Sequence, residues 1–181
     1  MMLTDEQLTR LKFPIGPFKA PDNIDGAELD SLVTTIDDAP AKYRALTQGL
    51  PDNDLAKSYR KGAWNIRQIV NHVADMQLLH LFRMKRAITE PDYDVITIVD
   101  QHAWALAPDG MNSPIDVSLD MFESLARRHV FLIRSLDEAQ LEKTYFHPIR
   151  KISLNQKQAV AMSAWHVQHH LEHIRIALAN S

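Results

Sequence analysis

Four long segments carry apolar residues at the three- and four-residue spacing of a single helix face, and this pattern most limits the possible folds. They span residues 27–49, 66–88, 114–136 and 154–179. Each is longer than the average helix of about 11–12 residues. Only 5 of the 181 residues are Gly, which disfavours a fold built on many tight turns. The sequence therefore predicts an all-α protein whose amphipathic helices bury their apolar faces against one another.

Helix-start signals precede three of these segments. The expected caps are Asn65 with Gln68, Ser113 before Pro114, and Ser153 with Gln156. Inside the first segment, Pro40 lacks the backbone N–H that a helix interior needs. We therefore expect Pro40 to kink this helix or to split it into two pieces.

The connection between the second and third helices is unusually long. Residues 89–113 form this connection, whereas antiparallel neighbours are usually joined by about 2–8 residues. The second helix is about 34 Å long at 1.5 Å per residue, a length that the connection can retrace. We therefore predict an up-down-down-up four-helix bundle, with a short helix near residues 101–104 inside the crossover.

The remaining segments are expected to pack on this bundle as parts of one domain, residues 1–181. Residues 1–26 form an N-terminal arm in this prediction. Thr4 with Gln7 indicates a short helix that ends near Leu11, and two prolines and a glycine then keep the chain extended. Residues 145–151 are expected to form a loop or a small hairpin.

The chain has nine histidines and no cysteine. A disulfide framework, an iron–sulfur cluster, a thiolate metal site and a Cys nucleophile are thereby excluded, so a metal ion would need His, Asp or Glu. His166 and His170 lie one turn apart on a helix, on the face that also carries Ala159 and Met162. That face should point into the bundle, and a buried imidazole without a partner is costly.

A third histidine is expected at the same height on another helix. His72 shares its helix face with the apolar residues Ile69 and Met76. If the two helices are antiparallel, His72 and His170 lie about 10 and 14 Å from the same end of the bundle, and His80 lies about two turns away. We therefore predict that His72, His166 and His170 hold one divalent metal ion, with one position left open.

Other side chains are candidates for the pocket or for orienting the ligands, while no catalytic residue is assigned. These candidates are Asp75, Trp104, His169 and His173. Asp75 is expected either to orient a ligand or to pair with Arg67 or Arg83. His129 is expected to be a hydrogen-bonded core residue.

Short segments in a fixed order resemble the YfiT branch of the DinB/YfiT-like superfamily of metalloenzymes. The matching residues are 13–18, 59–68, 71–75, 103–104, 145–148 and 165–173. The resemblance implies an up-down-down-up bundle, often a homodimer, with a three-histidine site for zinc, nickel or a similar divalent ion. The family's ligands fall on His72, His166 and His170, which agrees with the helix geometry.

The resemblance implies two activities. Some members are similar to thiol S-transferases that join bacillithiol or mycothiol to an electrophile, and others are described as metal-dependent hydrolases. A thiol bound to a metal loses its proton and then needs no base, and no carboxylate stands out as one. We therefore favour a thiol S-transferase that uses a low-molecular-weight thiol as co-substrate. The alternatives are a hydrolase that uses a metal-bound hydroxide and a non-catalytic bundle that binds a metal or a small ligand.

Charge and hydropathy narrow the range of partners. The formal net charge of −3 excludes a strongly basic nucleic-acid binder, and no apolar run approaches the roughly 20 residues of a membrane span. The first residues lack the pattern of a secretory signal. We therefore expect a cytoplasmic protein that acts on a small molecule, without a nucleic-acid or membrane partner.

Overall fold

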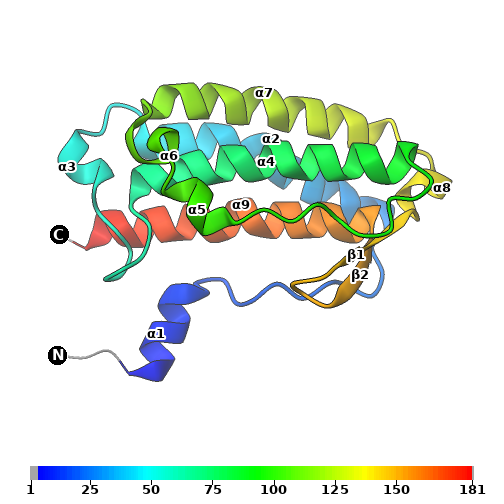
Figure 1. The fold of residues 1–181 in the computed structure, drawn as a ribbon, viewed down its shortest axis with the longest axis horizontal. Coiled ribbons are helices and arrows are strands. Elements are labelled where there is room, and N and C mark those ends of the chain that lie inside the picture. The colour runs from blue at the N-terminus through cyan, green and yellow to red at the C-terminus, as the bar shows by residue number, and fades with distance from the viewer. Residues whose placement is uncertain (1–3, 181) are drawn as a thin grey trace.

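A computed structural model describes residues 4–180 of the chain, in which four long helices form a bundle (Figure 1). They are α2 (Gly26–Thr47), α4 (Ile66–Thr89), α7 (Ile115–Arg134) and α9 (Gln156–Ala179). Helices α4 and α7 run in the same direction, opposite to α2 and α9 (Figure 1). The predicted up-down-down-up four-helix bundle is confirmed.

Shorter elements connect and extend the bundle. They are α1 (Asp5–Lys12), α3 (Asp52–Leu55), α5 (Gln101–Ala105), α6 (Pro108–Asn112), α8 (Glu138–Leu141), β1 (Thr144–His147) and β2 (Ile152–Asn155). The strands β1 and β2 pair as an antiparallel hairpin, so the fold is mostly rather than wholly helical. The short helix expected in the crossover is α5, whereas α3 and α6 were not predicted.

The crossover between α4 and α7 returns along α4 and is tied to it by side-chain hydrogen bonds. The guanidinium of Arg83 donates to the carbonyl oxygen of Thr97 at 2.7 and 3.1 Å, and the amide of Asn71 donates to the carbonyl oxygen of Gly110 at 2.9 Å. A Cβ atom at Gly110 would lie 2.8 Å from the carbonyl oxygen of Trp104. Only glycine therefore lets α5 and α6 pack this closely.

Helix α2 is not split at Pro40. It continues from Gly26 to Thr47 with Pro40 buried inside it, so of the two expected outcomes, a kink or a split, the split does not occur. Ile36, Ala39 and Tyr43 on either side of the proline are buried as well. Burial of this apolar face outweighs the one helical hydrogen bond that proline cannot donate.

Two of the predicted caps are wrong. Ser113 ends α6, where its N–H donates to the carbonyl oxygen of Asp109. Helix α7 begins at Ile115, and its N-cap residue Pro114 provides no side-chain hydrogen bond. Ser153 lies in β2, and Asn155 caps α9 instead. Both serines belong to elements that precede the helix, which a cap pattern alone does not reveal.

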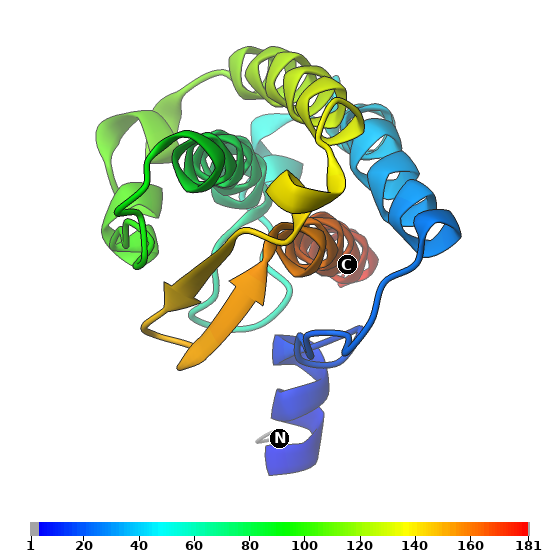
Figure 2. The same cartoon turned by 90° about the vertical axis from the view of Figure 1, so that its right-hand side faces the viewer.

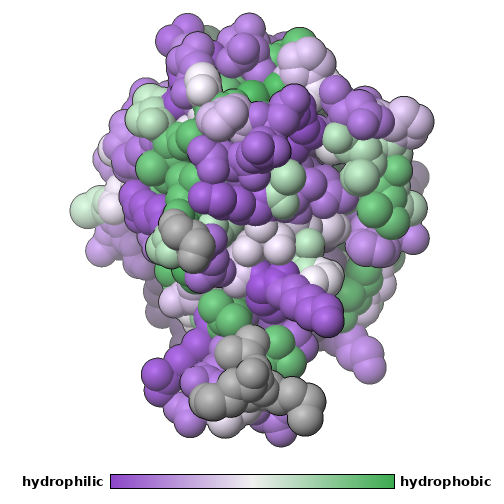
Figure 3. Space-filling view, turned by 90° about the vertical axis from the view of Figure 1, so that its left-hand side faces the viewer, coloured by the Kyte–Doolittle hydropathy of each residue, from purple (hydrophilic) through white to green (hydrophobic). Residues whose placement is uncertain are grey.

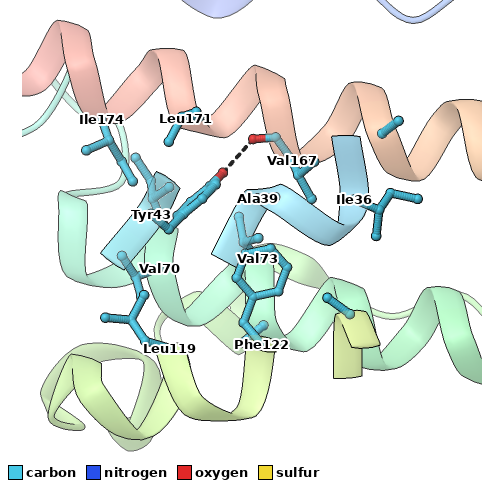
Figure 4. Packing of buried hydrophobic residues seen from close by; sticks show 14 of the residues in the cluster. Ile36, Ala39, Tyr43, Val70, Val73, Leu119, Phe122, Val167, Leu171 and Ile174 are labelled. Carbon is cyan, nitrogen blue, oxygen red and sulfur yellow. Dashed lines mark hydrogen bonds between the residues drawn. The ribbon is translucent and has the colours of Figure 1, made fainter. Parts of the chain in front are cut away.

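The core of the bundle lies around Tyr43, which is fully buried on α2. Its hydroxyl donates to the carbonyl oxygen of Val167 at 2.8 Å (Figure 4), and its ring meets the edge of Phe122 at a centroid distance of 5.4 Å. Tyr43 thus joins α2 to α9 and α7. His129 is buried and lies 2.9 Å from the amide nitrogen of Gln77, which confirms the predicted core histidine.

The N-terminal arm lies along α9. The indole N–H of Trp165 donates to the carbonyl oxygen of Gly16 at 3.1 Å. The side-chain amide of Gln158 donates to the carbonyl oxygen of Pro21 at 2.8 Å. In the view along the helices, α4 and α9 form one side of the bundle. The arm, the hairpin and the crossover lie on the outer surface of that side (Figure 2).

The end of the bundle that carries α3 presents mainly hydrophilic residues, with separate hydrophobic patches between them (Figure 3). Within residues 4–180, no helix combines the length and the apolar character that a membrane crossing requires.

Candidate metal centre

Helices α4 and α9 bring together the three histidines predicted as ligands. The ring nitrogens that His72, His166 and His170 offer lie within 4.8 Å of one another. The Nε2 atoms of His72 and His166 are 3.1 Å apart, although 94 residues separate them in the chain. The antiparallel packing of α4 on α9 and the one-turn spacing on α9 produce this arrangement.

This spacing of the nitrogens fits a divalent ion. Two imidazole nitrogens bound to one tetrahedral ion at 2.0–2.1 Å would lie about 3.3 Å apart, close to the 3.1 Å between His72 and His166. Three imidazoles leave a fourth coordination position for a substrate atom. Nitrogen ligands of this kind suit zinc, nickel, copper or iron.

The three imidazoles are neutral at pH 7. Burial, together with the charge that His169 would carry, lowers the pKa of His72 to about 3. Burial and the neighbouring rings hold the pKa values of His166 and His170 well below the ordinary value. Neutral imidazole is the form that binds a metal ion, so no proton has to be removed before binding.

His173 determines which nitrogen of His170 carries the proton. The Nε2–H of His173 donates to the carbonyl oxygen of Leu11 at 3.1 Å, which leaves its Nδ1 unprotonated because the ring is neutral. This Nδ1 can therefore accept from the Nδ1–H of His170, 3.3 Å away. The Nε2 of His170 then keeps its lone pair, as a metal ligand requires.

His169 and His173 both touch the predicted ligands. The ring nitrogens of His169, His170 and His173 form a second group within 4.8 Å. His169 stacks on Trp165 at a centroid distance of 4.5 Å, and His173 stacks on Tyr59 at 3.8 Å. Both are buried, so neither is a surface histidine.

His80 lies nearer to the cluster than we predicted. Its ring centroid is 5.6 Å from that of His166, and its Nδ1 lies 3.0 Å from the hydroxyl oxygen of Ser163. His166 precedes His170 by one turn on α9, and the antiparallel packing places it at a height between His72 and His80. The prediction compared the position of His80 along the bundle only with that of His72, and it therefore missed the contact between His80 and His166.

Trp64 covers the cluster, and Trp104 does not. The ring centroid of Trp64 lies 4.5 Å from that of His72 and 6.2 Å from that of His170. Its indole N–H donates to Nδ1 of His102 at 3.3 Å. Trp104 is 38% exposed on α5, without ring contacts to these histidines among the described residues. In the sequence, Trp64 lies just before the cap of α4 and within the segment 59–68 that carries the family resemblance.

Among the described residues, Asp75 belongs to neither group of side chains that could hold a metal ion. It is half-buried on α4, and burial together with the negative charge of Asp109 raises its pKa to about 6. The expected partners are engaged elsewhere: Arg67 pairs with Asp52 at 2.6 Å, and Arg83 binds the crossover backbone. The predicted pairing with either arginine is therefore wrong.

The bundle topology and the histidine cluster define a protein of the DinB type. Residues 35–174 match the DinB superfamily, and the chain belongs to this superfamily.

Within it, the chain is similar to YfiT. Relatives from Bacillus subtilis (YfiT) and Halalkalibacterium halodurans are both named "Putative metal-dependent hydrolase". YfiT is 30% identical over 91% of this chain and 92% of its own length, and the second relative is 37% identical over 92% and 96%.

Solved structures show the same fold. A structure of YfiT from Bacillus subtilis, described as "a probable metal-dependent hydrolase with an unusual four-helix bundle topology", has a TM-score of 0.87 at 30% identity. It covers 92% of this chain and 94% of the YfiT chain. The mycothiol-dependent maleylpyruvate isomerase has a TM-score of 0.65 at 14% identity over 81% of this chain and 60% of its own, a likeness of fold alone.

Proposed function

We propose that this protein is a hydrolase that uses one divalent metal ion, zinc or nickel, held by His72, His166 and His170. The observation that carries the proposal is that ring nitrogens of three histidines from two helices lie within 4.8 Å of one another. The names of the relatives support hydrolysis over thiol S-transfer, which the sequence alone had favoured.

The surrounding residues would prepare the site for this reaction. A divalent ion supplies Lewis acidity and lowers the pKa of a water molecule bound to it towards about 7. Trp64 shields His72 and His170 from bulk water, because its ring lies against both. His173 holds the proton of His170 on Nδ1, so that Nε2 of His170 is left with a lone pair for the ion.

The test combines metal analysis with an activity assay. Elemental mass spectrometry of the purified protein should find one metal ion per chain in the wild type and little in His72→Ala or His166→Ala. His129→Asn is the matched control, since His129 is buried outside the cluster and should leave the metal content unchanged. Metal retained in both alanine variants would rule out this site.

The activity assay uses a panel of esters and amides, each with and without chelator. We expect hydrolysis by the loaded wild type that is lost in His72→Ala. Hydrolysis that persists after removal of the metal would contradict the proposal.

Thiol S-transfer is the second candidate, and one observation favours it. No carboxylate forms a hydrogen bond to the three ligands among residues 4–180, and a bound thiolate attacks without a base. The chain has no cysteine, so the thiol would come from outside. Conjugation of bacillithiol to 1-chloro-2,4-dinitrobenzene, without hydrolysis of any ester, would select this reaction instead.

A further inference from the structure

A cavity of about 1130 Å³ lies beside the histidine cluster. The cavity is open to solvent, and three segments line it: residues 13–20 of the N-terminal arm, residues 98–101 of the crossover, and residues 147–152 of the hairpin. Most of its lining is apolar, from Phe13, Phe18, Ile98, Val99, Ile149 and Ile152. Small-molecule sites are usually about 300–1,000 Å³ and have apolar walls with a few polar groups, so the cavity can hold a small organic molecule.

A chain of stacked and edge-packed rings, two on the shorter route, connects this cavity to the predicted ligand His170. Phe13 lines the cavity, and its ring centroid lies 6.0 Å from that of His169. Phe18 lines it as well and lies 5.9 Å from Trp165, which stacks on His169. His169 in turn lies 4.9 Å from His170. A molecule in the cavity would therefore touch Phe13, which packs against His169 at the edge of the cluster.

Arg150 supplies a positive charge to the cavity. Its guanidinium carbon lies 5.5 Å from the ring centroid of Phe18 and 5.6 Å from that of Trp165, so two aromatic faces hold it in place. Its positive charge also acts on the histidine cluster, where it helps to lower the pKa values of His166 and His169.

The charge of Arg150 is not balanced within the protein. Among the ion pairs of the described residues, none involves Arg150 or Lys19, and both line the cavity. The one carboxylate in the lining, Asp100, accepts hydrogen bonds from the backbone at the start of α5. A planar guanidinium presents paired N–H donors that match a carboxylate.

We infer that this cavity binds substrates that carry a carboxylate on an apolar body, with Arg150 pairing with the carboxylate and the apolar walls holding the remainder. Arginine also binds phosphate well, but the mostly apolar lining favours the carboxylate of an organic acid. This inference names the substrate class of the proposed hydrolase, and the binding step itself does not depend on hydrolysis.

The binding test uses 4-phenylbutyrate and its neutral amide, 4-phenylbutyramide, measured by calorimetry. We expect the wild type to bind the carboxylate about tenfold more tightly than the amide, as a charge-assisted contact allows. Arg150→Gln should abolish this preference, and Arg150→Lys should retain part of it, which also shows that the fold tolerates the change. Arg128→Gln, an exposed position on α7, is the matched control and should behave as the wild type.

Three results would overturn the inference: equal affinity of the wild type for carboxylate and amide, a preference that survives in Arg150→Gln, or no binding of either compound.

A turnover experiment separates this inference from the proposed function. The charged ester 4-nitrophenyl hemisuccinate is compared with the neutral 4-nitrophenyl butyrate. The ratio of their kcat/KM values should exceed one in the wild type and fall towards one in Arg150→Gln. If neither ester is cleaved but the carboxylate still binds through Arg150, the proposed hydrolase fails and the carboxylate site stands.

Discussion

The Nε2 atom of His173 on α9 lies 3.1 Å from the backbone carbonyl oxygen of Leu11 at the N-terminal arm, 162 residues away in the chain. A carbonyl oxygen can only accept, so the contact assigns the proton of His173 to Nε2. Its Nδ1 then accepts from His170. The arm thereby influences His170, a predicted metal ligand, through His173.

Two substitutions at His173 separate these contacts. Asn places its side-chain oxygen near the position of Nδ1 and keeps the acceptor for His170, whereas Gln places its amide N–H near Nε2 and keeps only the contact with Leu11. We expect His173→Gln to weaken zinc binding about 10–100-fold and His173→Asn to weaken it much less. Competition with a chelator measures both affinities, and equal losses in the two variants would refute the role of His173.

The metal-free protein should lose stability as the pH falls from about 6.5 to 4. Burial lowers the pKa of His129 to about 4 from its ordinary value of 6.5, so across this range the unfolded chain binds the proton and the folded chain does not. The free energy of unfolding therefore decreases with falling pH. Each pKa unit corresponds to about 1.4 kcal/mol, so His129 alone accounts for up to about 3 kcal/mol.

His129→Asn provides the check, because the amide oxygen can still accept from Gln77. Urea unfolding at several pH values should show a shallower pH dependence in this variant than in the wild type. An identical slope in the two proteins would contradict the assignment.

Gly110→Ala should destabilise the protein. The new Cβ would meet the carbonyl oxygens of Trp104 and Ala105 at 2.8 and 3.0 Å, and these backbone atoms cannot move without separating α5 from α6. We expect a loss of about 1–3 kcal/mol in urea unfolding. Gly26→Ala is the control, since no heavy atom lies within 4 Å of its added Cβ. A loss of the same size in both variants would exclude the close approach as the cause.

Tyr43→Phe should weaken the junction between α2 and α9. It removes the buried hydroxyl that donates to Val167 at 2.8 Å while it keeps the ring contact with Phe122. We expect the free energy of unfolding to fall by about 0.5–1.5 kcal/mol, with metal content unchanged. A stability equal to that of the wild type would show that the hydroxyl contributes nothing.

The helices and the three candidate ligands could be predicted because they follow from local spacing. Apolar residues at helical intervals indicate which faces are buried, and one turn brings His166 and His170 together. The crossover is long enough to run back along α4, and this length was sufficient to predict that α4 and α7 are parallel. His72 could be predicted as the third ligand because, on a helix antiparallel to α9, it lies at nearly the same distance from the end of the bundle as His170.

The contacts around the cluster were decided only by the tertiary structure. Trp64, His80 and Arg150 reach the histidines or the cavity because the start of α4, the packing of α4 on α9 and the hairpin bring distant segments together. A cap pattern at Ser153 was overridden because that residue pairs in the hairpin. Helical periodicity is a property of neighbouring residues, whereas these contacts depend on where long connections return, which no local spacing encodes.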